Sequence, residues 1–121
     1  MSLINEIKVL KQLIEKESKT IKETLPGMIL LKPKDVKQIS TMVDRILGNT
    51  ASMVSFNKDI KTVKVLRDGI LIITNNIEVI LDELPEKSKN RKKVMRSILN
   101  IRKEVKKIAV DIIYREEHTA A

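Results

Sequence analysis

Apolar residues recur at intervals of three and four along most of this chain, the spacing that places side chains on one face of an α-helix. The pattern predicts four helices, over residues 2–24, 34–47, 51–84 and 86–115. Short segments separate them, so neighbouring helices should pack side by side along their apolar stripes. We therefore expect an all-α fold, an antiparallel helical bundle of three long helices and one short helix, with a frayed tail over residues 116–121.

The second of these helices is the short one. It should begin just after Pro33, where Asp35 and Gln38 have the spacing of a capping pair. Gly48 suits the left-handed residue that commonly stops a helix. The third helix should then run to Leu84, because the proline that follows cannot continue it.

The third helix has two features that bear on its structure. Several apolar residues lie off its main stripe, so its buried face is expected to be wide; they are Val65, Leu71, Ile72, Val79 and Leu81. A rival interpretation makes residues 62–74 a β-hairpin, because β-branched residues there flank a turn-like Arg-Asp-Gly at 67–69. The helical register extends far on both sides of that tripeptide, which favours the helix.

Length and composition set the class of protein. The chain has 121 residues, of which 42% are hydrophobic and 33% charged, a balance that predicts one folded domain over residues 1–121. It has no cysteine, so disulfides are excluded. The longest apolar runs, Met28–Leu31 and Ile70–Ile73, are far too short to span a bilayer. Its start lacks the features of a signal peptide, so we expect a cytoplasmic protein.

Charge is concentrated on the fourth predicted helix. Residues 87–107 contain ten basic residues and one acidic residue, Glu104, whereas the whole chain has a formal net charge of +8. The rest of the chain is therefore close to neutral. At about 100° per residue, five basic side chains fall on the side opposite the apolar stripe of this helix. They are Lys89, Lys92, Arg96, Lys103 and Lys107.

A continuous cationic stripe of this kind suits a polyanionic partner, because basic side chains near phosphates displace condensed counterions. The alternative is a merely solvated helix face, although such faces usually mix the two signs of charge. Phe56 and Tyr114 are the only aromatic residues, so stacking on single strands is not expected. Binding to nucleic acid would be weakly sequence-selective and directed to the backbone, and an acidic protein would satisfy the same charges.

No residue pattern indicates catalysis. His118 lies in the tail without a second histidine or a cysteine, and the glycines are isolated and form no phosphate-binding loop. Carboxylates are scattered and do not pair at helical spacing within an apolar stripe. We expect no enzyme activity, no metal and no cofactor.

An apolar segment lies where a bundle normally has a polar loop, and it consists of Met28, Ile29, Leu30 and Leu31. It either folds over the end of the bundle and closes the core, or forms an exposed contact for a partner or a second copy. The second function to consider is therefore a structural or adaptor protein, such as an assembly or virion subunit. Membrane attachment would need exposed apolar residues beside the cationic stripe, and the core is expected to consume them.

Overall fold

The computed structural model describes residues 3–28, 32–55, 61–84 and 91–119. Within these residues there are four α-helices, one 3-10 turn and no strand. The elements are α1 (Leu3–Thr24), η1 (Leu25–Gly27), α2 (Pro33–Ser55), α3 (Lys61–Glu83) and α4 (Arg91–Thr119). The all-α class predicted from the sequence is confirmed.

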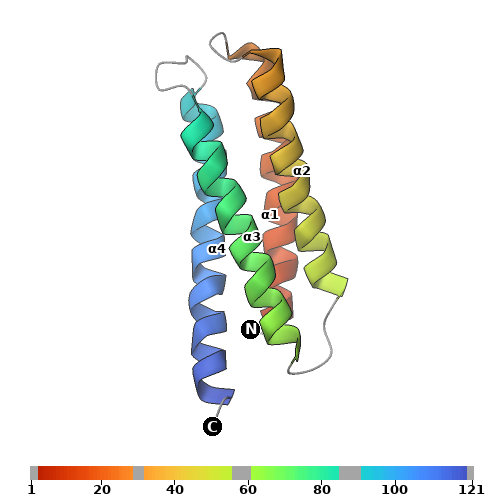
Figure 1. Cartoon of the computed structure of the whole chain (residues 1–121), viewed down its shortest axis with the longest axis vertical. Coiled ribbons are helices and arrows are strands. Elements are labelled where there is room, and N and C mark those ends of the chain that lie inside the picture. The colour runs from red at the N-terminus through yellow and green to blue at the C-terminus, as the bar shows by residue number, and fades with distance from the viewer. Residues whose placement is uncertain (1–2, 29–31, 56–60, 85–90, 120–121) are drawn as a thin grey trace.

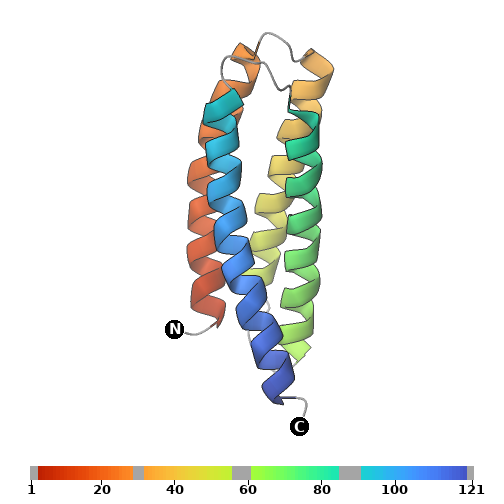
Figure 2. The same ribbon diagram turned by 90° about the vertical axis from the view of Figure 1, so that its left-hand side faces the viewer.

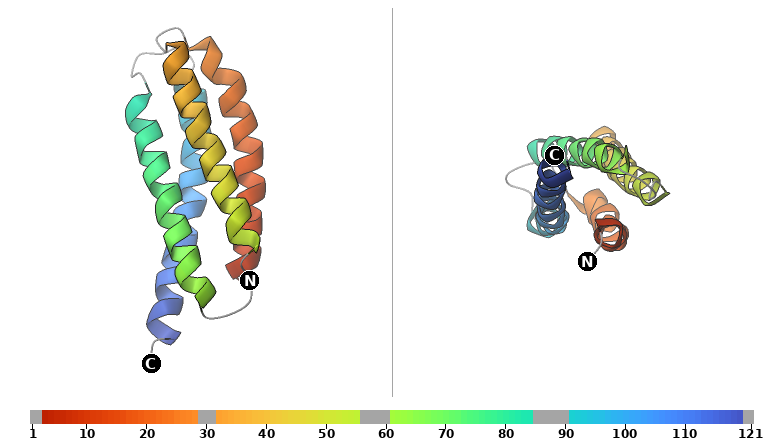
Figure 3. Two further views of the ribbon diagram at one scale, coloured as in Figure 1. Left: turned by 45° about the vertical axis from the view of Figure 1, so that its right-hand side comes forward. Right: turned by 90° about the horizontal axis from the view of Figure 1, so that it is seen from below.

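The four helices lie side by side in an elongated bundle (Figure 1). Figure 2 shows that α1 and α3 run one way along the long axis and that α2 and α4 run the other way. The main contacts join α1 to α2, α2 to α3, α3 to α4 and α4 to α1, and the end-on view in Figure 3 shows this cyclic order. Each helix thus packs on two neighbours and keeps an outer face.

The apolar stripes read from the sequence form a single buried cluster between the helices. Burying one such side chain stabilises a fold by about 1.5–3 kcal/mol, so this cluster is the main source of stability. In α4 every residue of the predicted stripe is at most 2% exposed, namely Val94, Ile98, Ile101, Val105, Ile108 and Ile112. The opposite side of α4 therefore points away from the core.

The prediction of a short second helix is wrong. Helix α2 has 23 residues, the same number as α3, and continues through Gly48 to Ser55. No described glycine has a positive φ, so Gly48 does not stop the helix. The buried face of α2 continues past it through Thr50 and Met53, which is why the backbone remains helical. The predicted third helix therefore loses its first residues to α2.

The start of α2 uses one of the two predicted capping residues. Pro33 is its first residue, a position where the missing N–H costs nothing. The Asp35 carboxylate accepts a hydrogen bond from the backbone N–H of Lys32 at 3.3 Å. Gln38 does not cap, because its Nε2 donates to Glu83 Oε1 on α3 at 3.2 Å. It ties the first turns of α2 to the last turn of α3.

The hairpin alternative for residues 62–74 is also wrong, because α3 is a continuous helix from Lys61 to Glu83. A Cβ added to Gly69 would lie 2.7 Å from the buried Met53 Sδ, far inside a normal contact. The Asn49 amide donates to the Gly69 carbonyl oxygen at 2.8 Å. Gly69 therefore lets α2 and α3 approach closely.

The expectation of a wide buried face on α3 holds only for Leu81, which is partly buried and packs against the core; the side chain of Val65 lies outside the description. Leu71, Ile72 and Val79 are 53%, 49% and 41% exposed. Only a narrow stripe of α3 enters the core, through residues such as Ile73, Ile77 and Ile80. Helix α3 thus presents apolar side chains on the surface.

Helix α4 extends beyond the C-terminal end of its predicted range of 86–115. It remains helical to Thr119, so most of the predicted frayed tail is helix. Its first described residue is Arg91, and residues 86–90 of the predicted range lie outside the described residues. Figure 2 shows the C-terminal turns of α4 projecting beyond the ends of the neighbouring helices.

Candidate functional site: the outer face of α4

Four of the five basic residues predicted to form a stripe lie within the described chain, and all four are exposed on α4. We call Lys92, Arg96, Lys103 and Lys107 the cationic face. The fifth, Lys89, lies outside the described residues. Among the described side chains no carboxylate is within ion-pair distance of the cationic face; the recorded ion pairs involve other residues. These charges are therefore not neutralised by the bundle.

Other arginines of α4 are directed to neighbouring groups. Arg102 Nη2 lies 2.9 Å from Glu78 Oε1 on α3, and Arg115 Nε lies 3.2 Å from Asp111 Oδ1 one turn back. Position on the helix decides this difference, because Arg102 lies near the border with α3. Arg102 joins α4 to α3, whereas the cations of the cationic face point outward.

Among the described side chains from Arg91 to Arg115, the fully exposed positions of α4 include no acid. From Arg91 to Arg115 its two acids, Glu104 and Asp111, are only partly exposed, whereas the fully outward positions are basic or apolar apart from Asn100. Four apolar side chains on this helix are exposed by 41–67%, namely Leu99, Val110, Ile113 and Tyr114. Sequence reasoning missed them, although the same helical projection that grouped the lysines would have placed them there.

A shallow hollow of about 380 Å³ lies among Lys103, Lys106, Lys107 and Val110. Val110 is 67% exposed, the most of any large apolar side chain in the described chain. Three lysine side chains therefore line the same hollow as one exposed aliphatic side chain. This combination can attract an anion and still bury an apolar group.

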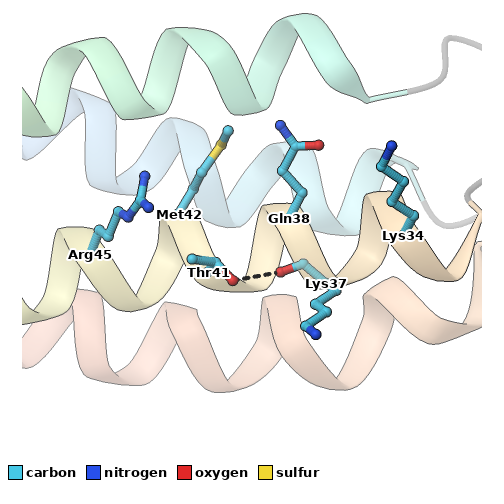
Figure 4. Close-up of a pocket in the computed structure, with 6 residues that line it drawn as sticks. All are labelled: Lys34, Lys37, Gln38, Thr41, Met42 and Arg45. Carbon is cyan, nitrogen blue, oxygen red and sulfur yellow. Dashed lines mark hydrogen bonds between the residues drawn. The ribbon is translucent and has the colours of Figure 1, made fainter.

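A second cationic hollow, of about 410 Å³, lies on α2 (Figure 4). It is lined by Lys34, Lys37, Gln38, Thr41, Met42 and Arg45. Figure 4 shows Lys34, Gln38, Met42 and Arg45 directed to the same side of the helix, whereas Lys37 points to the other. The Thr41 hydroxyl donates to the Lys37 carbonyl oxygen at 2.9 Å. Asp35 and Asp44 lie in the same stretch of sequence. Because acidic and basic residues are mixed there, the sequence did not indicate this cluster of basic residues.

Glu6 of α1 and Asp111 of α4 form a carboxyl pair that the sequence did not reveal. Burial raises the pKa of Glu6, and its hydrogen bond with Asp111 and the charge of that neighbour raise it further. Oxygen Oε2 of Glu6 is buried without a hydrogen-bond partner among the described atoms. The same hydrogen bond lowers the pKa of Asp111, with help from Arg115. The pair joins two helices far apart in the chain, so no local spacing could predict it.

Met28, the first residue of the predicted apolar loop, is 2% exposed and belongs to the hydrophobic cluster. Its backbone N–H donates to the Leu25 carbonyl oxygen at 3.1 Å. Met28 therefore closes one end of the core. Ile29, Leu30 and Leu31 lie outside the described residues.

Within the described ranges, no group of three or more His, Cys, Asp or Glu side chains could hold a metal ion. None of the described helices is long and apolar enough to cross a membrane. Comparison with protein-family models, with curated proteins and with solved structures finds no match to this chain.

Proposed function

We propose that this chain is a non-enzymatic binding module that docks on a polyanionic surface through the cationic face of α4. The observation that carries the proposal is the set of four exposed cations, Lys92, Arg96, Lys103 and Lys107, with no described carboxylate at ion-pair distance. They lie opposite the buried stripe of a helix that α1 and α3 hold in place. A partner can reach them without any rearrangement of the bundle.

Nucleic-acid backbone is the polyanion for which we propose the first test. Helix α4 offers Lys92 and Arg96 one turn apart and Lys103 and Lys107 one turn apart, with two turns between the pairs. At about 5.4 Å per turn along the axis, this spacing suits a row of phosphates. Each phosphate neutralised releases counterions and strengthens association at low salt. Among the exposed residues of α4 between Arg91 and Arg115 there is no Gln and a single Asn, Asn100. Hydrogen bonds to base edges would therefore contribute little to binding. An acidic protein is the other partner with suitable charge.

A salt titration of binding to duplex DNA and to RNA tests this function. Engagement of about five phosphates should give a log–log slope near −4 to −5 on duplex DNA. Reversal of Arg96 and Lys103 to Glu should weaken binding at low salt and leave helicity intact. Reversal of Lys8 and Lys16, which are exposed on α1, changes the net charge equally and is the matched control. Equal loss in both double variants would attribute binding to net charge alone and contradict a specific face.

A second function, self-association as a structural or adaptor protein, is favoured by the exposed apolar side chains of α3. Leu71, Ile72 and Val79 are each at least 41% exposed. Asp68 and Asp82 lie on the same outer side of α3, so this surface differs in sign from α4. If α3 is an interface between copies, sedimentation should detect oligomers that Ile72→Gln with Val79→Gln dissociates. A strict monomer at high concentration would contradict this function.

A further inference from the structure

The C-terminal half of α4 and the facing edge of α3 carry a group of exposed apolar side chains, which we call the apolar patch. It consists of Val110, Ile113 and Tyr114 of α4, at 67%, 53% and 58% exposure, and Leu71 of α3, at 53%. Lys103, Lys106 and Lys107 are exposed one to two turns away on α4. Such a mixture is not needed to bind a nucleic-acid backbone.

The ion pair between Glu78 and Arg102 identifies the sides of α3 and α4 that face each other. Leu71 is seven residues before Glu78, so it lies on the same side of α3, facing α4. Ile113 is eleven residues after Arg102, three helical turns on, and lies on the side of α4 facing α3. Because α3 and α4 run in opposite directions (Figure 2), both positions lie toward the same end of the bundle. Leu71 and Ile113 thus occupy the groove edge between the helices.

The charges around the patch restrict what can cover it. Between Arg91 and Arg115 the fully exposed charges of α4 are all basic, so an anionic surface complements them. Asp68 is an exposed acid one turn before Leu71 on α3, and Glu116 and Glu117 follow the patch in the sequence of α4. The covering surface must also accept aliphatic side chains, which the stacked interior of a duplex does not offer. An anionic bilayer provides both, because a layer of phosphates lies directly above hydrocarbon. Lysine can keep its ammonium at the phosphates while its methylene stem follows the apolar side chains inward.

We infer that the apolar patch and the surrounding lysines attach this protein to the surface of an anionic lipid bilayer, with α4 lying in the interface. The inference rests on the proposed function and names its partner. Val110 and Ile113 enter the boundary between headgroups and acyl chains. Tyr114 lies at headgroup depth, where an amphipathic ring is favoured. Lys103, Lys106 and Lys107 contact lipid phosphates.

The sequence-based objection to membrane contact does not hold for this face. It assumed that the core would bury the apolar residues beside the stripe, but these side chains lie outside the buried stripe of α4 and are more than half exposed. The binding inferred is peripheral, since none of the described helices could span a bilayer.

The chain carries its own reporter for the test. Tyr114 is the only tyrosine and there is no tryptophan, so ultraviolet emission at tyrosine wavelengths reports this one position. The protein is mixed with vesicles of phosphatidylcholine and phosphatidylglycerol, and with vesicles of phosphatidylcholine alone. Binding is measured by flotation, and depth by quenching of Tyr114 with lipids that carry a nitroxide on the acyl chain. Binding to duplex DNA is measured in parallel.

Two single variants with the same chemistry isolate the patch. Val110→Gln removes one valine from it, and Val9→Gln removes one valine from α1, away from every surface proposed for binding. Both side chains are at least 46% exposed, and Gln is a good helix former, so circular dichroism should be unchanged. The patch variant should bind anionic vesicles at least about tenfold more weakly, since each buried methylene contributes about fourfold, while its binding to DNA and the vesicle binding of the Val9→Gln variant remain unchanged.

The outcomes separate the two proposals. Anionic vesicle binding with quenched Tyr114, lost in the patch variant alone, supports the inference. Binding to DNA without binding to vesicles overturns the lipid inference and leaves the proposed function standing. Vesicle binding that the patch variant retains, or that leaves Tyr114 unquenched, also overturns it, because adsorption would then be purely electrostatic. Failure to bind either polyanion overturns both proposals.

Discussion

At the scale of single residues, two glycines within helices have opposite roles. Gly48 has no atom within 4 Å of an added Cβ, whereas Gly69 has Met53 Sδ at 2.7 Å. Gly48→Ala should therefore stabilise the protein by about 1 kcal/mol, the propensity difference at an exposed helical position. Gly69→Ala should instead destabilise it by about 1–2 kcal/mol, because overpacking exceeds that gain. Urea unfolding of both variants checks this, and equal stabilisation would mean that Met53 relaxes freely.

The Glu6–Asp111 pair predicts how stability changes with pH. The pKa of Glu6 is raised above its ordinary 4.5, so the folded state holds a proton that the unfolded state has lost, and stability falls as pH rises through that window. The pKa of Asp111 is lowered from 3.8, so its contribution is present above 3.8 and is lost only in stronger acid. Glu6→Gln gives Asp111 an amide N–H donor in place of the protonated carboxyl group, and it removes the negative charge that Glu6 carries when it is ionised.

We expect Glu6→Gln to stabilise the protein at pH 7 by about 0.5 kcal/mol, the scale of a partly exposed charge pair. The gain should vanish near pH 4, where Glu6 already carries its proton. Thermal unfolding across this range is the measurement. Glu23→Gln, an exposed position on the same helix, controls for the loss of one negative charge. A gain that is constant with pH would show that the carboxyl pair is not its source.

At the scale of helices, apolar periodicity predicted which side chains are buried better than where the helices end. The stripes of α1 and α4 are buried as expected. The boundary between α2 and α3 was placed at Gly48, but α2 ends at Ser55 and α3 begins at Lys61. The apolar register continues across both places, so periodicity alone cannot locate the break, and a glycine within a helix resembles a stop signal. Only a tertiary contact, the packing of Met53 against Gly69, shows that α2 continues past Gly48 instead of ending there.

The α2–α3 contact has a polar component that can be tested. Asn49 Nδ2 donates to the Gly69 carbonyl oxygen across the two helices at 2.8 Å, partly buried, and Asn49→Ala should destabilise the protein by about 1 kcal/mol. Asn76 Nδ2 donates only to Ile72 O within its own helix at 2.9 Å, in an exposed position. Asn76→Ala should be nearly neutral by the same unfolding measurement. If the two costs are equal, the amide of Asn49 does not join the helices.

At the scale of the whole molecule, the candidate site was predictable only in part. Net charge and helical projection placed Lys92, Arg96, Lys103 and Lys107 outward, where the structure has them exposed. The same projection could not show which off-stripe apolar residues a neighbouring helix would cover. The inferred neighbourhood of Leu71 and Ile113 depends on the packing of α3 against α4 in opposite directions, with Glu78 and Arg102 paired between the two helices. Information of that kind resides in tertiary contacts between segments remote in sequence.

The concentration of charge on α4 should oppose folding. Residues 87–107 carry ten of the 24 basic residues of the chain and one acid, and Lys92–Arg96 and Lys103–Lys107 are like-charged pairs one turn apart on one exposed face. Such pairs destabilise a helix by about 0.2–0.5 kcal/mol each. Lys92→Gln with Lys107→Gln should therefore stabilise the protein by about 0.5–1 kcal/mol at low salt.

The salt dependence of that gain identifies its cause. Near 1 M salt the screening length falls to about 3 Å, so the advantage of the double variant should largely disappear. Lys19→Gln is the contrasting control, because Glu15 and Glu23 lie one turn away on either side of Lys19 and its loss should give no stabilisation at any salt concentration. Thermal unfolding of the three proteins at low and high salt is the measurement. A double variant that is more stable at low salt and binds polyanions less tightly would show that this arrangement of charge favours binding over stability. Unchanged stability would instead mean that solvent already screens these charges, and the cationic face would then impose no cost on the fold.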